Sequence, residues 1–205
     1  IRSRALTLGF DACRITDAGR PESADRFREA LASGRHAEMH WLARTAEKRA
    51  DPQLVLPGVR SVVLVAASYA DVPTPSEMPS SEPTGVIARY ARHDDYHEVL
   101  GERLATLSRE IDERFGAGSR SLWYVDTGPV LERDLAQRAG LGFVGKHTGL
   151  ISRTVGNWFL IGEILTPVEL PPDPPEPNRC GSCSRCLSAC PTGALPAPFT
   201  LDARR

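Results

Sequence analysis

A run of four cysteines near the C-terminal end is the feature that most restricts what this chain can fold into. The run precedes a proline with the spacing C-x2-C-x2-C-x3-C-P, and its members are Cys180, Cys183, Cys186 and Cys190. Two-residue spacers allow a tight turn to direct three thiolates at three corners of one cubane cluster, whereas in two-cluster ferredoxins the fourth cysteine of such a run binds the other cluster. The run therefore predicts an iron–sulfur site.

Two other uses of clustered cysteines suit this spacing less well. Structural zinc sites commonly pair two C-x2-C units across a longer loop, so that the four ligands can form a tetrahedron. Disulfides are typical of secreted domains, and the first residues of this sequence show no secretory signal pattern. We therefore favour an iron–sulfur cluster over zinc or disulfides.

The number of cysteines leaves two assignments open. A [4Fe-4S] cluster takes four thiolates, and the sequence holds five cysteines, of which Cys13 lies in an expected strand and is best interpreted as a buried structural thiol. Either the four clustered cysteines bind a single cluster, or further ligands for two clusters lie beyond Arg205. We favour the second assignment, and we expect the chain, which begins at Ile1 rather than Met, to be a fragment.

Composition and charge set broad limits on the remainder of the chain. The 205 residues are 41% apolar and 25% charged, which is ordinary for a globular protein and sufficient for one full-sized domain with a small appendage. The formal net charge of -1 gives no global reason to expect binding to nucleic acid or membranes. No apolar run approaches the roughly 18 residues that span a bilayer. We therefore expect a cytoplasmic protein.

Apolar periodicity predicts alternating strands and helices over residues 1–166. The clearest strand is the β-branched run Ser61–Ala67, which is typical of a strand covered on both faces, and the clearest helix is Tyr96–Phe115. Further strands are expected at Phe10–Thr16, Val86–Ala91, Ser121–Val125 and Trp158–Leu165, further helices at 1–9, Glu22–Ser33, Met39–Leu42 and Pro129–Gly140, and a Pro-rich loop at 71–85. The pattern predicts an α/β sandwich for residues 1–166, a Pro-rich linker at 167–177 and a cluster module at 178–205.

Asp126 lies where an expected strand ends and an expected helix begins. Because ligands gather outside the carboxyl ends of strands in open α/β sheets, this side chain is a candidate proton donor, kept protonated by burial beside a bulky cofactor. A helix N-cap is an equally good interpretation. Lys146 and His147, in a Gly-rich turn, are weaker candidates for holding polar ligand groups, and Arg49 alone is most simply a surface ion-pair residue.

Six segments taken together resemble the epoxyqueuosine reductases. They are residues 89–97 (RYARHDDYH), 126–132 (DTGPVLE), 138–148 (RAGLGFVGKHT), 158–166 (WFLIGEILT), the cysteine run, and 201–205 (LDARR). Because they follow one another in the same order over nearly the whole chain, the resemblance is more specific than any single motif.

The resemblance implies an α/β (α+β) cobalamin-binding core, similar to nitroreductases and reductive dehalogenases, followed by a partial ferredoxin-like module. It implies reduction of epoxyqueuosine to queuosine in tRNA by cobalamin. The electrons come from an external donor and pass through two [4Fe-4S] clusters. Carried over by motif position, the resemblance implies that Asp126 is the proton donor. It also implies that cobalamin is contacted by Asp126, Arg49, Arg133 and Lys146. Four more cysteines follow the last segment in this family, so neither cluster has all its ligands here. We expect a monomer without membrane contacts.

Two alternatives remain open from the sequence. The first is another corrinoid iron–sulfur reductase, similar to the dehalogenases, that acts on a small molecule. The second is a cluster-bearing electron-transfer module, which leaves about 165 residues of α/β domain without a role.

Overall fold

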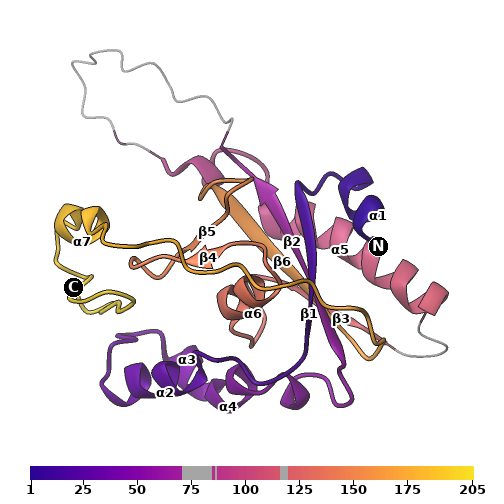
Figure 1. The fold of residues 1–205 in the computed structure, drawn as a ribbon, viewed down its shortest axis with the longest axis horizontal. Helices are drawn as coiled ribbons and strands as arrows, with labels where there is room; N and C mark the ends of the chain where they lie inside the picture. Colours follow the sequence, from indigo (N-terminus) through magenta and orange to yellow (C-terminus); the bar gives the residue numbers. More distant parts are fainter. Residues whose placement is uncertain (71–84, 86, 116–119) are drawn as a thin grey trace.

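A four-stranded antiparallel sheet forms the centre of the protein. The computed structural model describes residues 1–70, 85, 87–115 and 120–205. The strand order is β1-β2-β6-β3, and each neighbouring pair is antiparallel (Figure 1). The strands are β1 (Ala12–Asp17), β2 (Ser61–Ser68), β3 (Leu122–Val125) and β6 (Phe159–Thr166), and a separate two-stranded sheet pairs β4 (Phe143–Val144) with β5 (Leu150–Ile151).

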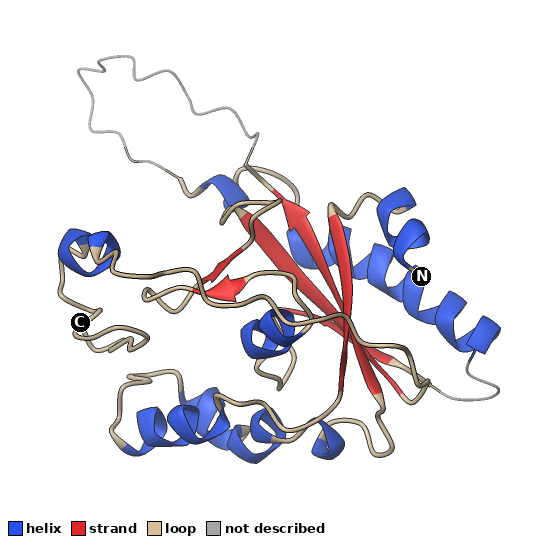
Figure 2. Ribbon diagram, viewed as in Figure 1, coloured by secondary structure: helices blue, strands red, loops and turns tan. Residues whose placement is uncertain are grey.

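Helices cover the sheet on both sides, which gives three layers (Figure 2). One face packs against α1 (Arg2–Thr7) and α5 (Tyr96–Phe115), and the other packs against α6 (Glu132–Arg138). The short helices are α2 (Ala24–Ala32), α3 (His40–Arg44), α4 (Ala46–Ala50), α7 (Arg185–Ala189) and the 3-10 turns η1 (Pro52–Leu54) and η2 (Arg89–Ala91). Among the helices described here, none is both long and apolar enough to cross a bilayer.

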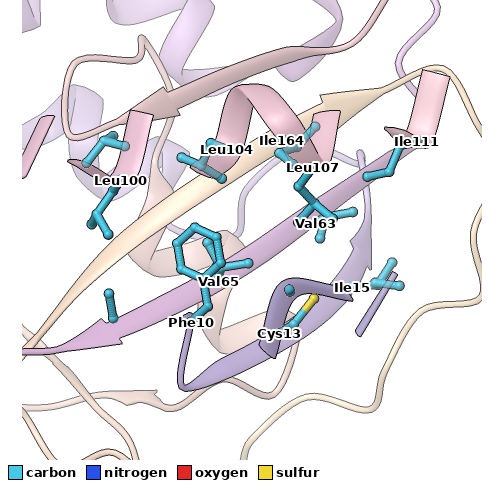
Figure 3. Close-up of a cluster of buried hydrophobic side chains, with 13 residues drawn as sticks. Phe10, Cys13, Ile15, Val63, Val65, Leu100, Leu104, Leu107, Ile111 and Ile164 are labelled. Atoms are coloured by element: carbon cyan, nitrogen blue, oxygen red, sulfur yellow. The ribbon is translucent and has the colours of Figure 1, made fainter. Parts of the chain in front are cut away.

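Strand β2 is buried on both faces, as its β-branched sequence predicts. Val63 and Val65 face the α5 side, where Leu104 is fully buried against them (Figure 3). Val62 and Leu64 face the opposite layer and pack with the α6 side chains. Burying a side chain of this size stabilises the fold by about 1.5–3 kcal/mol, so β2 anchors both cores.

Two local predictions are wrong, and one general rule does not apply to this sheet. The helix α6 begins at Glu132 rather than Pro129, because residues 127–131 form the turn that leaves β3. Residues 89–91 form a 3-10 turn instead of a strand, and Val86 lies outside the described residues, as does the expected loop apart from Gly85. The sheet is antiparallel throughout its named strands, so the rule for the carboxyl ends of parallel strands does not explain the position of Asp126.

The Pro-rich segment after β6 is attached to the sheet edge. Its Asp173 accepts a hydrogen bond from the Ile15 amide through Oδ2 and donates one from its own amide to the Ile15 carbonyl, each over 2.8 Å. Further along, the Glu176 amide donates to the carbonyl of Gln137 in α6 over 3.1 Å. An edge strand such as β1 exposes unpaired backbone groups. Asp173 forms hydrogen bonds with both the amide and the carbonyl of Ile15. The segment predicted as a spacer is therefore packed against the α/β core.

Candidate functional site

A cavity of about 600 Å³ opens at one end of the sheet. Because β6 runs antiparallel to both of its neighbours, its first residues lie beside the last residues of β2 and β3: Phe159 pairs with Ser68, and Gly162 pairs with Val125. Tyr69 follows β2 directly and Asp126 follows β3 directly, so both line the cavity. The antiparallel register brings together side chains that are far apart in the sequence.

Asp126 stands on a strained turn at the edge of this cavity. Its φ of 58° is in the left-handed region, which an aspartate adopts more readily than a branched residue, and the amide of Thr127 bonds back to the Val125 carbonyl over 2.6 Å. The α6 N-cap is Leu131, so the helix-cap interpretation of Asp126 is wrong. Asp126 is exposed toward the cavity.

The hydroxyl group of Tyr96, at the start of α5, donates a hydrogen bond to Oδ2 of Asp126 over 3.0 Å. Burial raises the pKa of Tyr96 well above its ordinary value of 10.0, and the hydrogen bond to Asp126 raises it further. Tyr96 therefore keeps its proton at neutral pH and acts toward Asp126 only as a donor. Sequence reasoning missed this partner, because nothing local connects Tyr96 with a residue thirty positions away.

Aromatic side chains form one wall of the cavity. The ring of Tyr69 makes edge contacts with Trp158 at 5.9 Å and with Tyr90 at 6.3 Å, measured between ring centroids, and Tyr90 contacts Tyr96 at 6.0 Å. The guanidinium group of Arg89 lies 4.7 Å from the Trp158 ring centre. The three tyrosines also line an adjoining cavity of about 290 Å³, so they separate the two spaces. The wall offers apolar faces with polar edges.

Another part of the cavity wall combines Arg133 with the turn between β4 and β5. Arg133 lines the cavity, and its Nη1 donates to the carbonyl of Thr148 over 3.3 Å; its expected contact with cobalamin stays a prediction. The turn closes with a bond from the Gly145 amide to the Gly149 carbonyl at 2.9 Å. His147 contributes to the same wall and accepts the Gly149 amide at Nδ1.

Arg49 and Glu163 lie behind the cavity wall. Arg49 does not line the cavity; its guanidinium donates to the Val130 carbonyl over 2.9 Å and to Oγ1 of Thr45 over 3.0 Å. Glu163, on β6, is 1% exposed, and its Oε2 has no hydrogen-bond partner among the described residues. Burial raises the pKa of Glu163 well above 4.5, and the negative charges of Glu132 and Asp126 add to the rise, which Arg49 partly opposes. Sequence reasoning missed Glu163, although a lone acid in an apolar strand is a usable signal.

The four clustered cysteines lie on one loop–helix–loop segment. The amide of Cys183 bonds to the carbonyl of Cys180 over 3.2 Å, Cys186 lies in α7, and Cys190 ends that helix. All four are at least partly exposed, unlike the buried Cys13. Within the described part of the chain, no group of three or more His, Cys, Asp or Glu side chains is arranged to hold a metal ion. The structure therefore keeps the thiols in one segment without gathering them around a common point.

Lys146 reaches this cysteine segment rather than the cavity. Its Nζ donates to the carbonyls of Gly181 over 2.7 Å and Cys183 over 2.8 Å, and its backbone amide donates to Sγ of Cys180 over 3.4 Å. The residues that line the cavity include His147 and Thr148 but not Lys146.

Comparison with known proteins gives consistent matches. The family model described as "Epoxyqueuosine reductase QueG, DUF1730" matches residues 49–127. An epoxyqueuosine reductase from Gloeobacter violaceus is 47% identical over 210 residues, which cover all of this chain and 63% of that protein, and one from Xanthomonas campestris is 41% identical, with 58% of its length covered. This chain belongs to the epoxyqueuosine reductase family. It spans roughly half to two thirds of the curated relatives that it matches.

Solved structures of the family superimpose on the same fold. An epoxyqueuosine reductase crystallised with an epoxyqueuosine-modified tRNA stem loop matches with a TM-score of 0.86 at 32% identity, over 99% of this chain and 54% of that one. A catabolic reductive dehalogenase matches with a TM-score of 0.55 at 18% identity over 97% of this chain. The second likeness establishes a shared mixed α/β fold, and the predicted ferredoxin-like module stays a prediction.

Proposed function

We propose that this chain carries the catalytic core of an enzyme that reduces epoxyqueuosine to queuosine in tRNA. The observation that carries the proposal is the position of Asp126, which stands hydrogen-bonded to Tyr96 at the edge of a cavity of about 600 Å³. The sequence around Asp126 belongs to a chain that is 47% identical, over its whole length, to an epoxyqueuosine reductase.

The residues around the cavity fit cobalamin, which the family implies. Its volume is in the range of cofactor pockets, and the aromatic wall gives a broad flat surface to one side. Arg133, the turn through His147 and Thr148, and the first residues of β6 would hold the cofactor. Cobalamin would supply the electron-rich metal centre that reduces the epoxide, chemistry that amino-acid side chains do not provide.

Asp126 would supply the proton as the epoxide oxygen leaves. A ligand bound over the cavity would exclude water from Asp126. The hydroxyl of Tyr96 keeps Oδ2 occupied, which leaves Oδ1 as the oxygen that can present the proton. General acids in this role contribute about 10²–10⁴-fold to the rate.

The cysteine segment would hold iron–sulfur clusters that pass electrons toward the cavity. Its four thiols are the donors that [4Fe-4S] clusters use, and the amide of Lys146 already donates a hydrogen bond to Sγ of Cys180. We propose that Cys180, Cys183 and Cys186 share one cluster and that Cys190 binds a second, within a ferredoxin-like module that begins near residue 178. An external donor would reduce the clusters.

The substrate proposed is tRNA, because a relative of the same fold was crystallised with a modified tRNA stem loop. We further propose a cytoplasmic monomer. A second candidate function, reduction of a small molecule by a dehalogenase-like corrinoid enzyme, draws support from the fold shared with a reductive dehalogenase.

The test uses the full-length protein, reconstituted anaerobically with iron, sulfide and cobalamin. Visible absorption reports the clusters and the corrinoid, and mass spectrometry of digested tRNA reports conversion of epoxyqueuosine to queuosine under a strong reductant. Turnover that Asp126→Asn abolishes, with cobalamin binding intact, supports the proposal. A fully loaded enzyme that forms no queuosine would reject it in favour of the small-molecule reductase.

A further inference from the structure

All of the polar groups of Lys146 contact residues 180–199, which contain the cysteine segment and the turn that follows it. Its amide donates to Sγ of Cys180 over 3.4 Å, its carbonyl accepts the amide of Phe199 over 2.9 Å, and its ammonium group donates to the carbonyls of Gly181 and Cys183. One residue of the α/β core thus holds the segment at four atoms.

The same turn forms part of the cavity wall. Lys146 is followed directly by His147 and Thr148, which both line the cavity, and the bond between Gly145 and Gly149 closes the turn. A second bond across this junction joins Nδ2 of Asn178 to the carbonyl of Val144 over 2.8 Å. The turn is therefore a short structural connection between the cavity and the thiols.

The choice of lysine at this position is informative. Lys146 and Lys48 are the two lysines in a sequence with 25 Lys and Arg residues, so arginine serves nearly every other basic position. The compact ammonium group of Lys146 directs separate N–H bonds at two carbonyls of one tight loop.

We propose that Lys146 is a positioning residue for the iron–sulfur cluster that Cys180 and Cys183 bind, and that its side chain docks the cysteine loop on the cavity wall. This inference rests on the proposed function. The ammonium charge and the N–H bond to the Cys180 sulfur stabilise the more negative, reduced state of such a cluster, which raises its reduction potential. In this role Lys146 does not contact cobalamin through its side chain.

Two variants of the reconstituted full-length protein test the side chain. Lys146→Met keeps the backbone amide and the apolar stem but removes the charge and both carbonyl bonds, and Lys146→Arg restores the charge. Lys48→Met, on the exposed surface of α4, is the matched control. The readouts are a dithionite potentiometric titration followed by electron paramagnetic resonance, the rate at which an iron chelator removes the cluster, and cobalamin uptake.

We expect Lys146→Met to lower the potential of one cluster and to lose iron several-fold faster, with cobalamin uptake unchanged. Lys146→Arg should recover part of the shift in potential, and Lys48→Met should match the parent protein. Cluster assembly that fails in Lys146→Met, with native circular dichroism and normal cobalamin uptake, also supports the positioning role. If Lys146→Met does not fold, the test uses Lys146→Arg alone. A cluster reduction potential in Lys146→Arg that differs from that of the parent protein then supports the positioning role.

Three results would overturn the inference. The first is a Lys146→Met protein with the parent potential, spectrum and rate of iron loss. The second is loss of cobalamin instead of a change in the cluster, which would return Lys146 to the cofactor contacts. The third is an unfolded Lys146→Met together with a Lys146→Arg protein that matches the parent. If the parent protein itself takes up no cluster, the proposed function fails rather than this inference alone.

Discussion

The hydroxyl oxygen of Tyr96 and Oδ2 of Asp126 lie 3.0 Å apart, joined by a hydrogen bond between the first residue of α5 and the turn that follows β3. The bond connects the helix on one face of the sheet with the cavity at its end. Because the pKa of Tyr96 is raised, the tyrosine holds its proton across the physiological range and fixes the orientation of the carboxyl group.

Removal of this hydroxyl should slow turnover without emptying the cavity. The Tyr96 hydroxyl would stabilise the carboxylate that forms as Asp126 gives up its proton, and a hydrogen bond to a charged group contributes about 1.5–3 kcal/mol. Tyr96→Phe should therefore lower kcat about ten- to hundredfold. The measurement is steady-state formation of queuosine, with cobalamin binding followed by absorption. In a double-mutant cycle with Asp126→Asn, the two losses should not add; full additivity would show that the tyrosine does not act through Asp126.

Glu163 should make the folded state less stable as pH rises. Its pKa is raised above 4.5 by burial, so between pH 4.5 and the folded-state pKa the native protein binds a proton that the unfolded chain releases. The stabilisation is complete below pH 4.5 and is lost as pH rises through the folded-state pKa, by at most about 1.4 kcal/mol per pH unit. Urea denaturation of the apoprotein between pH 5 and 8 measures this slope.

Glu163→Gln cannot ionise and should flatten that slope, making the variant more stable than the parent at the alkaline end. The exposed Glu169 provides the control, because Glu169→Gln should leave the slope unchanged. Identical slopes for the parent and Glu163→Gln would mean that Glu163 ionises in the folded protein as it does in the unfolded chain.

The attachment of the Pro-rich segment depends on Asp173. Asp173→Ala removes the acceptor for the Ile15 amide and the ion pair with Arg2 at 2.8 Å. An amide left without its partner at a partly buried edge should reduce the free energy of unfolding by about 1–3 kcal/mol. Glu169→Ala, which breaks an exposed pair with Arg60, should change it by no more than about 0.5 kcal/mol. Equal effects in chemical denaturation would show that Asp173 is an ordinary surface acid.

A substitution at Gly140 tests the attachment of the Pro-rich segment in a second way, through a steric clash. A Cβ atom there would lie 2.3 Å from the carbonyl oxygen of Pro174, and the φ of Gly140 is +76°. Gly58 has a φ of +81° with nothing within 4 Å, so Gly58→Ala measures the backbone strain alone, about 1 kcal/mol. Gly140→Ala should be more destabilising than Gly58→Ala and should increase proteolysis within residues 171–177. Matching losses of stability would indicate that the segment moves aside freely.

The sequence was most informative where the signal is local. The burial of β2, the span of α5 and the end of α1 before Gly9 all follow from apolar periodicity and turn residues, and the structure confirms them. The relation of Asp126 to a cavity was expected for a different reason, because the rule for strand ends in open α/β sheets was applied to a sheet that is antiparallel. Periodicity shows that a strand is buried but does not identify its neighbours.

Long-range contacts account for the features that were missed. The hydrogen bonds from Tyr96 to Asp126 and from Lys146 to Gly181 join residues 30 and 35 positions apart. The sequence around one partner does not predict the contact with the other. The side chain of Glu163 is buried because both faces of β6 are covered in the folded protein. The Pro-rich segment has the composition of a free linker, and only the exposed edge of β1 explains why it is fixed in place.

The central position of β6 has a consequence for biosynthesis. β6 is the only described strand that pairs with β3, and it supplies the second neighbour of β2, so neither edge of the cavity can form before residues 159–166 have been translated. Pairings between distant segments form slowly. The four clustered cysteines follow the end of β6 by 14 to 24 residues, so the last strand of the sheet is translated before any thiol of the proposed cluster site.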